Sequence, residues 1–365
     1  MGVLTISGIF QDVVLASMTA TFTARDSTSR PGTVAPEAAE RSGSPGSTIA
    51  WENLGYEGRT FVTGGLDPAG LTAVTGREAS MPIRVYAGLA GHDDGLGDVD
   101  LDEMAQEVVA ELDRTDAWER EVVAVVTTTG TGWVDPLAVQ ALELVQDGDT
   151  AVAAMQYSVN PSWVTLVLDL DQPARAGQAL FDAVQSRWAE LPEGDRPQLV
   201  AFGVSLGSYG SQSAFPSLED LTARADGAVW AGTPRFTPLW SDLTRARDAG
   251  SPEIHPVLDG GATARWGTAN GGDQGYADLG PTDSPGWPTS STRATASCGG
   301  GGPRPGTRTT GSTSGRVRTS CPGCAGGLGS PGCSSSRTCS WPDRTTCRWV
   351  TATTTARATS TRSRG

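Results

Sequence analysis

Lysine is absent from this chain of 365 residues, and only two histidines occur in it. Every basic side chain is therefore arginine, and the formal net charge is −14. An acidic surface of this kind disfavours nucleic acid as a general partner, because a phosphate backbone is bound by clustered cations. The two histidines, His92 and His255, restrict where a reaction could find an imidazole base.

Cysteine is missing from the first 297 residues, which leaves the redox compartment of the protein undetermined. The pair Cys321-Pro-Gly-Cys324 resembles the spacing of a zinc knuckle, but its surroundings hold almost no apolar residues. We therefore expect no metal site and no cofactor. The six cysteines all lie in the C-terminal part of the chain: Cys298, Cys321, Cys324, Cys333, Cys339 and Cys347.

A clean membrane span is also lacking. The best candidate runs from Val3 to Phe22, but Gln11 and Asp12 lie in its middle. It lacks the basic start of a signal peptide as well.

Apolar residues are scarce in residues 288–365, which contain no Ile, Met, Phe or Tyr and one leucine, Leu328. Such a segment cannot bury enough apolar surface to offset its chain entropy, so it is expected to be disordered. Residues 24–50, rich in Ser, Thr, Pro and Gly, are typical of an extended linker.

Between these regions, short apolar runs alternate with segments of helical periodicity. This alternation predicts a doubly wound, mostly parallel sheet covered by helices on both faces. Two helix starts are marked by capping residues, Asp100 with Glu103 and Asp135 with Pro136. The expected strands are 83–86, 121–128, 150–157, 199–204 and 227–231, and the expected helices are 101–112, 136–144, 174–188 and 217–224, with another after 205.

The strand ending at residue 204 runs directly into Gly203-Val-Ser-Leu-Gly207. Glycines on both sides of a serine suit a sharp strand-to-helix turn that lifts the hydroxyl clear of the sheet. Ser205 is therefore the candidate nucleophile. An ordinary Gly/Ser loop is the alternative interpretation.

A serine nucleophile also needs amide donors for the oxyanion. We expect one donor to be the backbone N–H of Leu206, at the start of the following helix. The loop Thr129-Gly-Thr-Gly-Trp133 is expected to supply the other, through Gly130 or Thr131, because its glycines let a ligand approach the backbone. Alternatively, this loop is a turn without a role.

Neither histidine suits the role of base. His255 follows the last expected strand too closely, and its neighbouring prolines favour a surface loop. His92 precedes the nucleophile and, beside Asp93 and Asp94, is expected to be a solvated loop residue without the ligands of a metal site.

Several motifs together resemble those of an actinobacterial α/β-hydrolase family whose members carry an N-terminal membrane region. The resemblance implies a serine hydrolase with Ser205 as nucleophile and a membrane-anchored intact protein. It also implies that Val3–Phe22 is the stub of a membrane helix. The matching motifs are Arg41-Ser-Gly-Ser-Pro-Gly46, Trp51-x-x-Leu-Gly-x-x-Gly-Arg-x-Phe-Val62, Pro82-Ile-Arg-Val-Tyr86, Thr129-Gly-Thr-Gly-Trp-Val-Asp-Pro136, Gln156-Tyr-Ser, Pro161-Ser-Trp163 and Phe202-Gly-x-Ser-Leu-Gly-Ser208.

The chain departs from that family after about Pro288, where the family continues with an Asp and a Gly-His-Gly-His-His-Tyr-like segment. Permitted codons for Trp349-Val-Thr-Ala-Thr-Thr-Thr-Ala356, read from the third base, encode Gly-His-Gly-His-His-Tyr. We therefore hypothesise a frameshift near Pro288 that removes the acid and the base.

The sequence thus predicts three parts: a stub, linker and packing segment over residues 1–79, a truncated hydrolase domain over 80–287, and the tail over 288–365. The expected activity is hydrolysis of a small-molecule or lipid ester through an acyl-enzyme on Ser205, nearly lost in the chain as written. Acyl transfer to another acceptor and a non-catalytic binding or scaffolding module remain alternatives.

Overall fold

The computed structural model describes residues 15–92, 99–253, 256–268 and 348–353, the last range by its backbone alone. All of these residues belong to one unit. The segment 287–345 lies outside the described residues.

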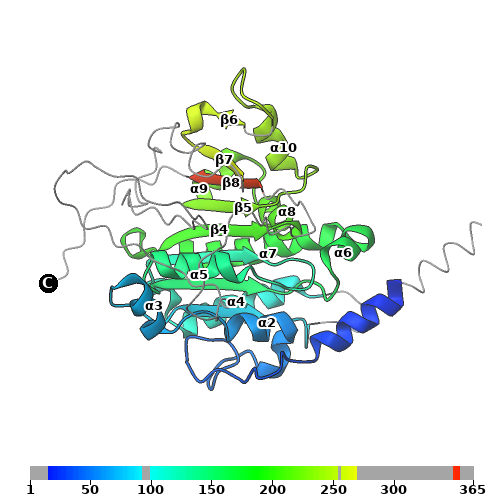
Figure 1. The fold of residues 1–365 in the computed structure, drawn as a ribbon, viewed down its shortest axis with the longest axis vertical. Coiled ribbons are helices and arrows are strands. Elements are labelled where there is room, and N and C mark those ends of the chain that lie inside the picture. Colours follow the sequence, from blue (N-terminus) through cyan, green and yellow to red (C-terminus); the bar gives the residue numbers. More distant parts are fainter. Residues whose placement is uncertain (1–14, 93–98, 254–255, 269–347, 354–365) are drawn as a thin grey trace, which may run out of the picture. The chain divides into compact units, whose positions relative to one another are not determined.

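Five parallel strands form the central sheet of an α/β-hydrolase fold (Figure 1). Their order in the sheet is β1-β3-β2-β4-β5, so β4 lies between β2 and β5. Every residue of β2 and β3 is buried, which explains why these strands are apolar except for one threonine each, instead of alternating. The five expected strands are confirmed as β1 (Ile83–Ala87), β2 (Val122–Thr127), β3 (Thr150–Met155), β4 (Gln198–Val204) and β5 (Gly227–Ala231).

Beyond β5 the sheet continues with three antiparallel strands: β8 (Arg348–Thr353), β7 (Ala264–Thr268) and β6 (Val257–Leu258). The expectation of a disordered tail is therefore wrong for residues 348–353. Without β8, the outer edge of β5 would expose unpaired backbone groups, and the sequence Arg-Trp-Val-Thr-Ala-Thr has the β-branched and aromatic residues that suit a strand.

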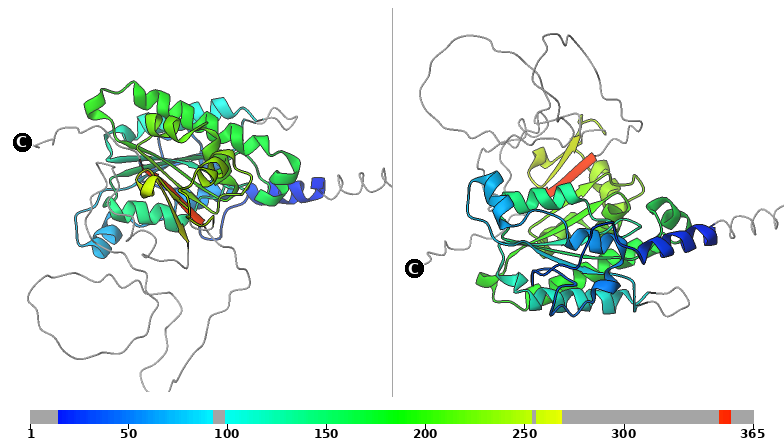
Figure 2. Two further views of the ribbon diagram at one scale, coloured as in Figure 1. Left: turned by 90° about the horizontal axis from the view of Figure 1, so that it is seen from above. Right: turned by 60° about the horizontal axis from the view of Figure 1, so that its bottom comes forward.

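Helices cover both faces of the sheet (Figure 2). On one face lie α4 (Leu101–Arg114) and α7 (Asp171–Ala189), which contact each other, and on the other lies α5 (Pro136–Val145) with α3 (Pro68–Thr75). The Asp100 and Asp135 side chains cap α4 and α5 as the sequence predicted. The other helices are α2 (Gly55–Val62), α6 (Ser162–Leu168), α8 (Leu206–Ser213), α9 (Leu218–Arg224) and α10 (Pro238–Arg245), with short 3-10 turns η1 (Trp51–Leu54), η2 (Ala117–Glu119), η3 (Glu193–Asp195) and η4 (Asp259–Gly261).

Part of the segment expected to be an extended linker is packed against the domain. Arg41 forms a parallel bridge with Arg84 on β1 and is buried. The buried carboxylate of Glu111 on α4 accepts hydrogen bonds from Ser47 and from the amide and hydroxyl of Thr48. The composition is that of a linker, but one buried acid holds its serine and threonine side chains in place.

A helix over residues 15–26 precedes that segment, and it includes the C-terminal part of the expected membrane stub. The first part of Val3–Phe22, residues 3–14, lies outside the described residues. Among the helices that the structure describes, none combines the length and the apolar character needed to span a bilayer.

Candidate active site

Ser205 occupies a sharp turn between the end of β4 and the start of α8. Its backbone has φ 55° and ψ −120°, a conformation that is strained for any residue except glycine. Its N–H donates to the Ala231 carbonyl on β5 at 2.8 Å, and its own carbonyl accepts from the Ser208 amide at 3.0 Å. The residue is exposed. The turn is thus held from both sides while the side chain reaches solvent.

Both flanking glycines are required by close backbone contacts. A Cβ on Gly203 would overlap the carbonyl oxygen of Gly207. A Cβ on Gly207 would overlap the carbonyl of Thr127 and lie 2.6 Å from that of Thr128, at the end of β2. The two glycines therefore allow α8 to start directly against the neighbouring strand, which is the geometry of a nucleophile elbow.

A buried polar cluster supports the first turn of α8. The hydroxyls of Ser208 and Thr233 are 2.6 Å apart, and the side-chain amide of Gln212 donates to both, at 3.0 and 3.2 Å. Thr233 belongs to the loop after β5, so these bonds join the helix that follows Ser205 to the neighbouring strand end. This cluster fixes the direction of the helix and thereby of the serine.

The loop Thr129–Trp133 follows β2, the strand beside β4, as the predicted role in an oxyanion hole requires. It is closed by a hydrogen bond from the Thr129 amide to the Trp133 carbonyl at 3.1 Å. The Gly130 amide donates to the Ser162 hydroxyl at 3.2 Å, so a ligand could use it only if Ser162 moved. Thr131 is half-buried, and Leu206, as the first residue of α8, has an amide without an intrahelical acceptor. Their oxyanion role remains a prediction.

Sequence reasoning assigned no role to Gln156, which holds this loop. Gln156 is buried after β3, and its side-chain amide lies 3.4 Å from the Thr131 carbonyl and 3.2 Å from the Asp26 carboxylate. The Tyr86 hydroxyl donates to the Gly132 carbonyl at 2.8 Å. The Gln156-Tyr-Ser motif was the available signal, but nothing in the sequence links it to Asp26, 130 residues away.

His92 does not reach Ser205. Its ring nitrogens face the carboxylates of Glu103 and Glu107, at 3.4 and 3.1 Å, and its side chain is only 7% exposed. The expectation of a solvated histidine is therefore wrong, because α4 covers the ring. It follows β1, three strand spacings or about 14 Å from β4.

His255, Asp93, Asp94 and the six cysteines lie outside the described residues. Among the residues that the structure does describe, no cluster of His, Cys, Asp or Glu could hold a metal ion.

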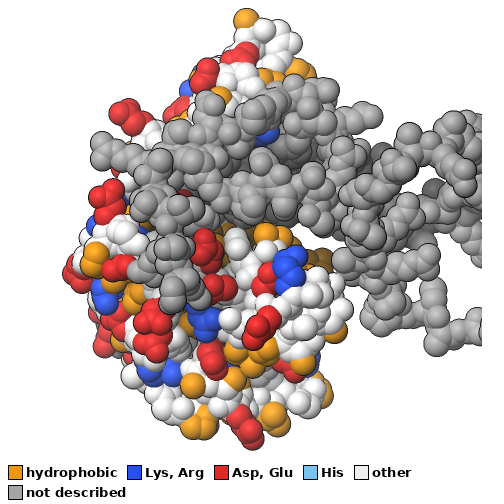
Figure 3. All heavy atoms as spheres, turned by 90° about the vertical axis from the view of Figure 1, so that its left-hand side faces the viewer, with side chains coloured by type: hydrophobic (Ala, Val, Ile, Leu, Met, Phe, Trp, Pro, Cys, Tyr) orange, Lys and Arg blue, Asp and Glu red, His pale blue; other side chains and the backbone are white. Residues whose placement is uncertain are grey.

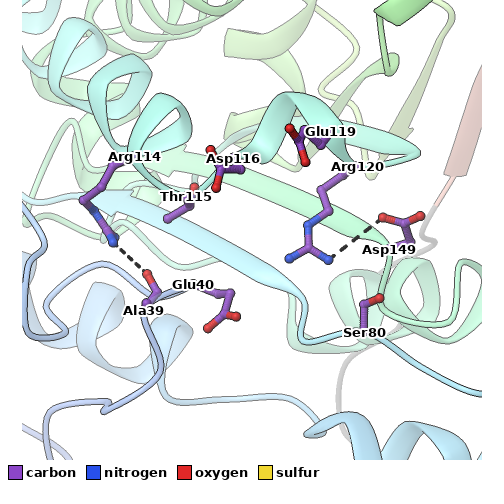
Figure 4. Close-up of a pocket in the computed structure, with 9 residues that line it drawn as sticks. All are labelled: Ala39, Glu40, Ser80, Arg114, Thr115, Asp116, Glu119, Arg120 and Asp149. Carbon is purple, nitrogen blue, oxygen red and sulfur yellow. Dashed lines mark hydrogen bonds and ion pairs between the residues drawn. The ribbon is translucent and has the colours of Figure 1, made fainter.

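The end of the sheet where the parallel strands begin lies opposite Ser205 and has a different surface. Where Figure 3 shows this face uncovered, acidic and arginine side chains are interspersed with apolar ones. It contains a polar hollow of about 450 Å³ (Figure 4). In it Arg114 donates to the Ala39 carbonyl at 2.8 Å, and Arg120 lies 3.9 Å from Asp149. Asp149 directly precedes β3, so the hollow is at the far end of the strands from Ser205.

The central parallel sheet and the turn at Ser205 define a protein of the hydrolase-fold class. Comparison with known families supports this at the level of sequence. The α/β-hydrolase family matches residues 83–282, and the N-terminal part described for the same family matches residues 1–65. The chain therefore belongs to the α/β-hydrolase family. Neither the curated proteins nor the solved structures gave a match.

Proposed function

We propose that this protein is a serine hydrolase of the esterase or lipase type that uses Ser205 as its nucleophile. The observation that carries the proposal is the strained and exposed turn at Ser205, enclosed by two glycines that cannot carry a side chain. Strain at a non-glycine residue costs on the order of 1–3 kcal/mol, and it is retained where the surrounding structure enforces it.

In the proposed reaction, the Ser205 oxygen attacks the ester carbonyl carbon while its proton passes to a base. The carbonyl oxygen becomes an oxyanion, for which the Leu206 amide is the proposed donor. When the carbonyl re-forms, the C–O bond to the alcohol breaks, and the alcohol leaves with the proton from the base. Water then attacks the acyl-enzyme, giving the acid and the free serine.

Among the described residues, no base or acid has been assigned to this scheme. Of the histidines, His92 is held by Glu103 and Glu107, and His255 lies outside the described residues. The proposal therefore includes the frameshift near Pro288, with low activity for the chain as it stands. A gene sequence that continues in one uninterrupted frame from codon 280, with no alternative frame encoding the histidine-rich motif, would contradict this part.

The substrate class within the proposal is a small-molecule or lipid ester, and the intact family member is a membrane-anchored protein. Transfer of the acyl group to a sugar or lipid instead of water is a variant of the same chemistry. Analysis of products with alternative acceptors distinguishes the two.

A fluorophosphonate probe tests the nucleophile, because the serine oxygen displaces fluoride and becomes covalently labelled. We expect slow labelling of the chain as it stands and fast labelling of a protein read in the other frame after Pro288. Ser205→Ala should abolish labelling in both, whereas Ser213→Ala, at the end of the same helix, should not. Labelling that persists in Ser205→Ala would assign the reaction to another residue.

A non-catalytic binding module is the second candidate, because the one described histidine is engaged elsewhere. It predicts no labelling of Ser205 in either reading frame, although both proteins fold.

A further inference from the structure

Among the described residues, six of the eight exposed large apolar side chains lie at the end of the sheet where the parallel strands finish. They come after the carboxyl ends of β2, β3 and β5 in the sequence. Ser205 follows the carboxyl end of β4, at the same end of the sheet. Two others, Val34 and Val145, lie elsewhere. The six at this edge, all at least 42% exposed, are Leu137, Trp163, Leu166, Val167, Leu168 and Phe236.

Four of these side chains belong to the short helix α6. Trp163 is 55% exposed and Val167 is 68% exposed, although a helix on the surface of a water-soluble protein normally turns such residues inward. Val164 and Thr165 fill the buried side of α6, so its outward side is apolar as well. A helix that is apolar on both sides lacks a polar face toward water.

The helix over residues 15–26 extends this surface. An apolar hollow of about 830 Å³ lies between this helix and Leu168. On the helix it is lined by small side chains such as Ala16, Ala20 and Ala24. From residue 15 to 24 it carries no charged side chain, and residues 1–14 contain a single charge, Asp12. The described part of this helix is therefore uncharged up to residue 24, where it lies beside Leu168 of α6.

The surface also adjoins the candidate active site. The Ser162 hydroxyl at the start of α6 accepts the Gly130 amide, and Phe236 packs edge-on against Tyr209 of α8, with ring centroids 5.4 Å apart. Of the charged residues near it, Arg25 is paired with Glu57 and Arg235 with Glu253.

We propose that α6 and the helix over residues 15–26 rest on a lipid bilayer, with Trp163, Leu166, Val167 and Leu168 in contact with the lipid. Tryptophan beside aliphatic residues is the composition that membrane interfaces favour. Because the surface is uncharged and the chain is acidic, the preferred bilayer is zwitterionic, and anionic lipid weakens binding. The inference rests on the proposed function in that Ser205 then faces the lipid from which an ester would come, and it adds a contact of the folded domain to the membrane anchor proposed there.

Flotation of the full chain with phosphatidylcholine vesicles tests this surface, and two matched valines give the control. Val167→Ser should lower the partition coefficient about fivefold, because one exposed apolar side chain is lost from the contact. Val145→Ser makes the same change on a residue 51% exposed at the opposite edge and should leave partitioning unchanged. Equal partitioning of the two variants would overturn the proposal.

Two further measurements distinguish lipid contact from self-association and from catalysis. The chain has eleven tryptophans, so Trp163 contributes only a part of the fluorescence. Brominated acyl chains should quench this part, and the quenching should be weaker in Trp163→Phe. If Val167→Ser instead reduces self-association in sedimentation without affecting vesicle binding, the surface joins two copies and the proposal fails. Ser205→Ala should float like the unchanged protein, so a failure of the proposed catalysis does not affect this result.

Discussion

Ser205 adopts backbone angles that glycine accepts without strain, since φ 55° and ψ −120° correspond to the first central position of a type II′ turn. The serine is therefore retained at a cost in stability. Replacing it with glycine should remove this cost, whereas replacing it with alanine should not.

We predict that Ser205→Gly is more stable than Ser205→Ala by about 1 kcal/mol, because glycine removes the strain and alanine keeps it. Urea unfolding of the two variants measures the difference. Equal stability would mean that the turn is relaxed and that strain does not mark the nucleophile.

Gly207→Ala should destabilise the protein by about 3 kcal/mol, because the added methyl group would meet the Thr127 and Thr128 carbonyls, which belong to backbone and cannot rotate away. Gly194→Ala is the control, since no atom lies within 4 Å of a Cβ at that position. Thermal unfolding should separate the two variants by several degrees. A mild effect at Gly207 would contradict the close packing of α8 on β2.

At the scale of elements, the loop after β2 depends on residues far away in the sequence. Gln156 joins Thr131 to Asp26, and Ser162 takes the Gly130 amide. Three side chains from outside the candidate oxyanion loop therefore hold it, namely those of Gln156, Ser162 and Tyr86.

Gln156→Leu should speed hydrogen exchange of the amides of residues 129–133 and lower stability by about 2 kcal/mol, since buried acceptors lose their donor. Gln178→Leu removes an exposed amide that donates to the Ser213 carbonyl and should leave the loop unchanged. Exchange measured by mass spectrometry compares the two. An unaltered loop in Gln156→Leu would show that Gln156 does not position it.

The elements that the sequence predicted correctly have local causes. Asp100 and Asp135 cap their helices with their own side chains, and the turn at Ser205 is specified by glycines two residues away. The helix contact of His92 and the pairing of β8 with β5 connect residues that periodicity does not relate. Hydrogen-bond partners distant in sequence leave no local pattern, and for this reason Gln156 and Ser162 were not predicted as supports of the site.

For the molecule as a whole, the N-terminal segment is attached through buried charged groups. Arg84 forms two hydrogen bonds with Glu143, at 2.8 and 2.9 Å, and also donates to the Phe61 carbonyl. Glu111 holds the serine-rich segment that precedes η1. For Glu111, whose pKa is shifted by folding, stability should depend on pH.

Burial acts to raise the pKa of Glu111, but hydrogen bonds from Arg114 and Thr48 outweigh it, so the pKa lies below the ordinary value of 4.5. A carboxyl group whose pKa is lowered by folding contributes stability above its unfolded pKa, and this contribution is lost as the pH falls through the folded value. Glu111→Gln should thus cost about 2 kcal/mol at pH 7 and progressively less below pH 4.5. Urea unfolding across this range measures it, and a cost independent of pH would exclude a role for the charge.

The contact between Asp26 and Gln156 also decides where a shortened version of this protein can begin. Asp26 is the last residue of the N-terminal helix, yet its carboxylate accepts from both the Tyr56 amide and Gln156, at 3.0 and 3.2 Å. The family boundary near residue 83 would suggest cutting the chain well after it. A protein trimmed at that boundary would retain Ser205 and lose a support of the loop beside it, so an inactive fragment of that kind would say little about the chemistry of the whole chain.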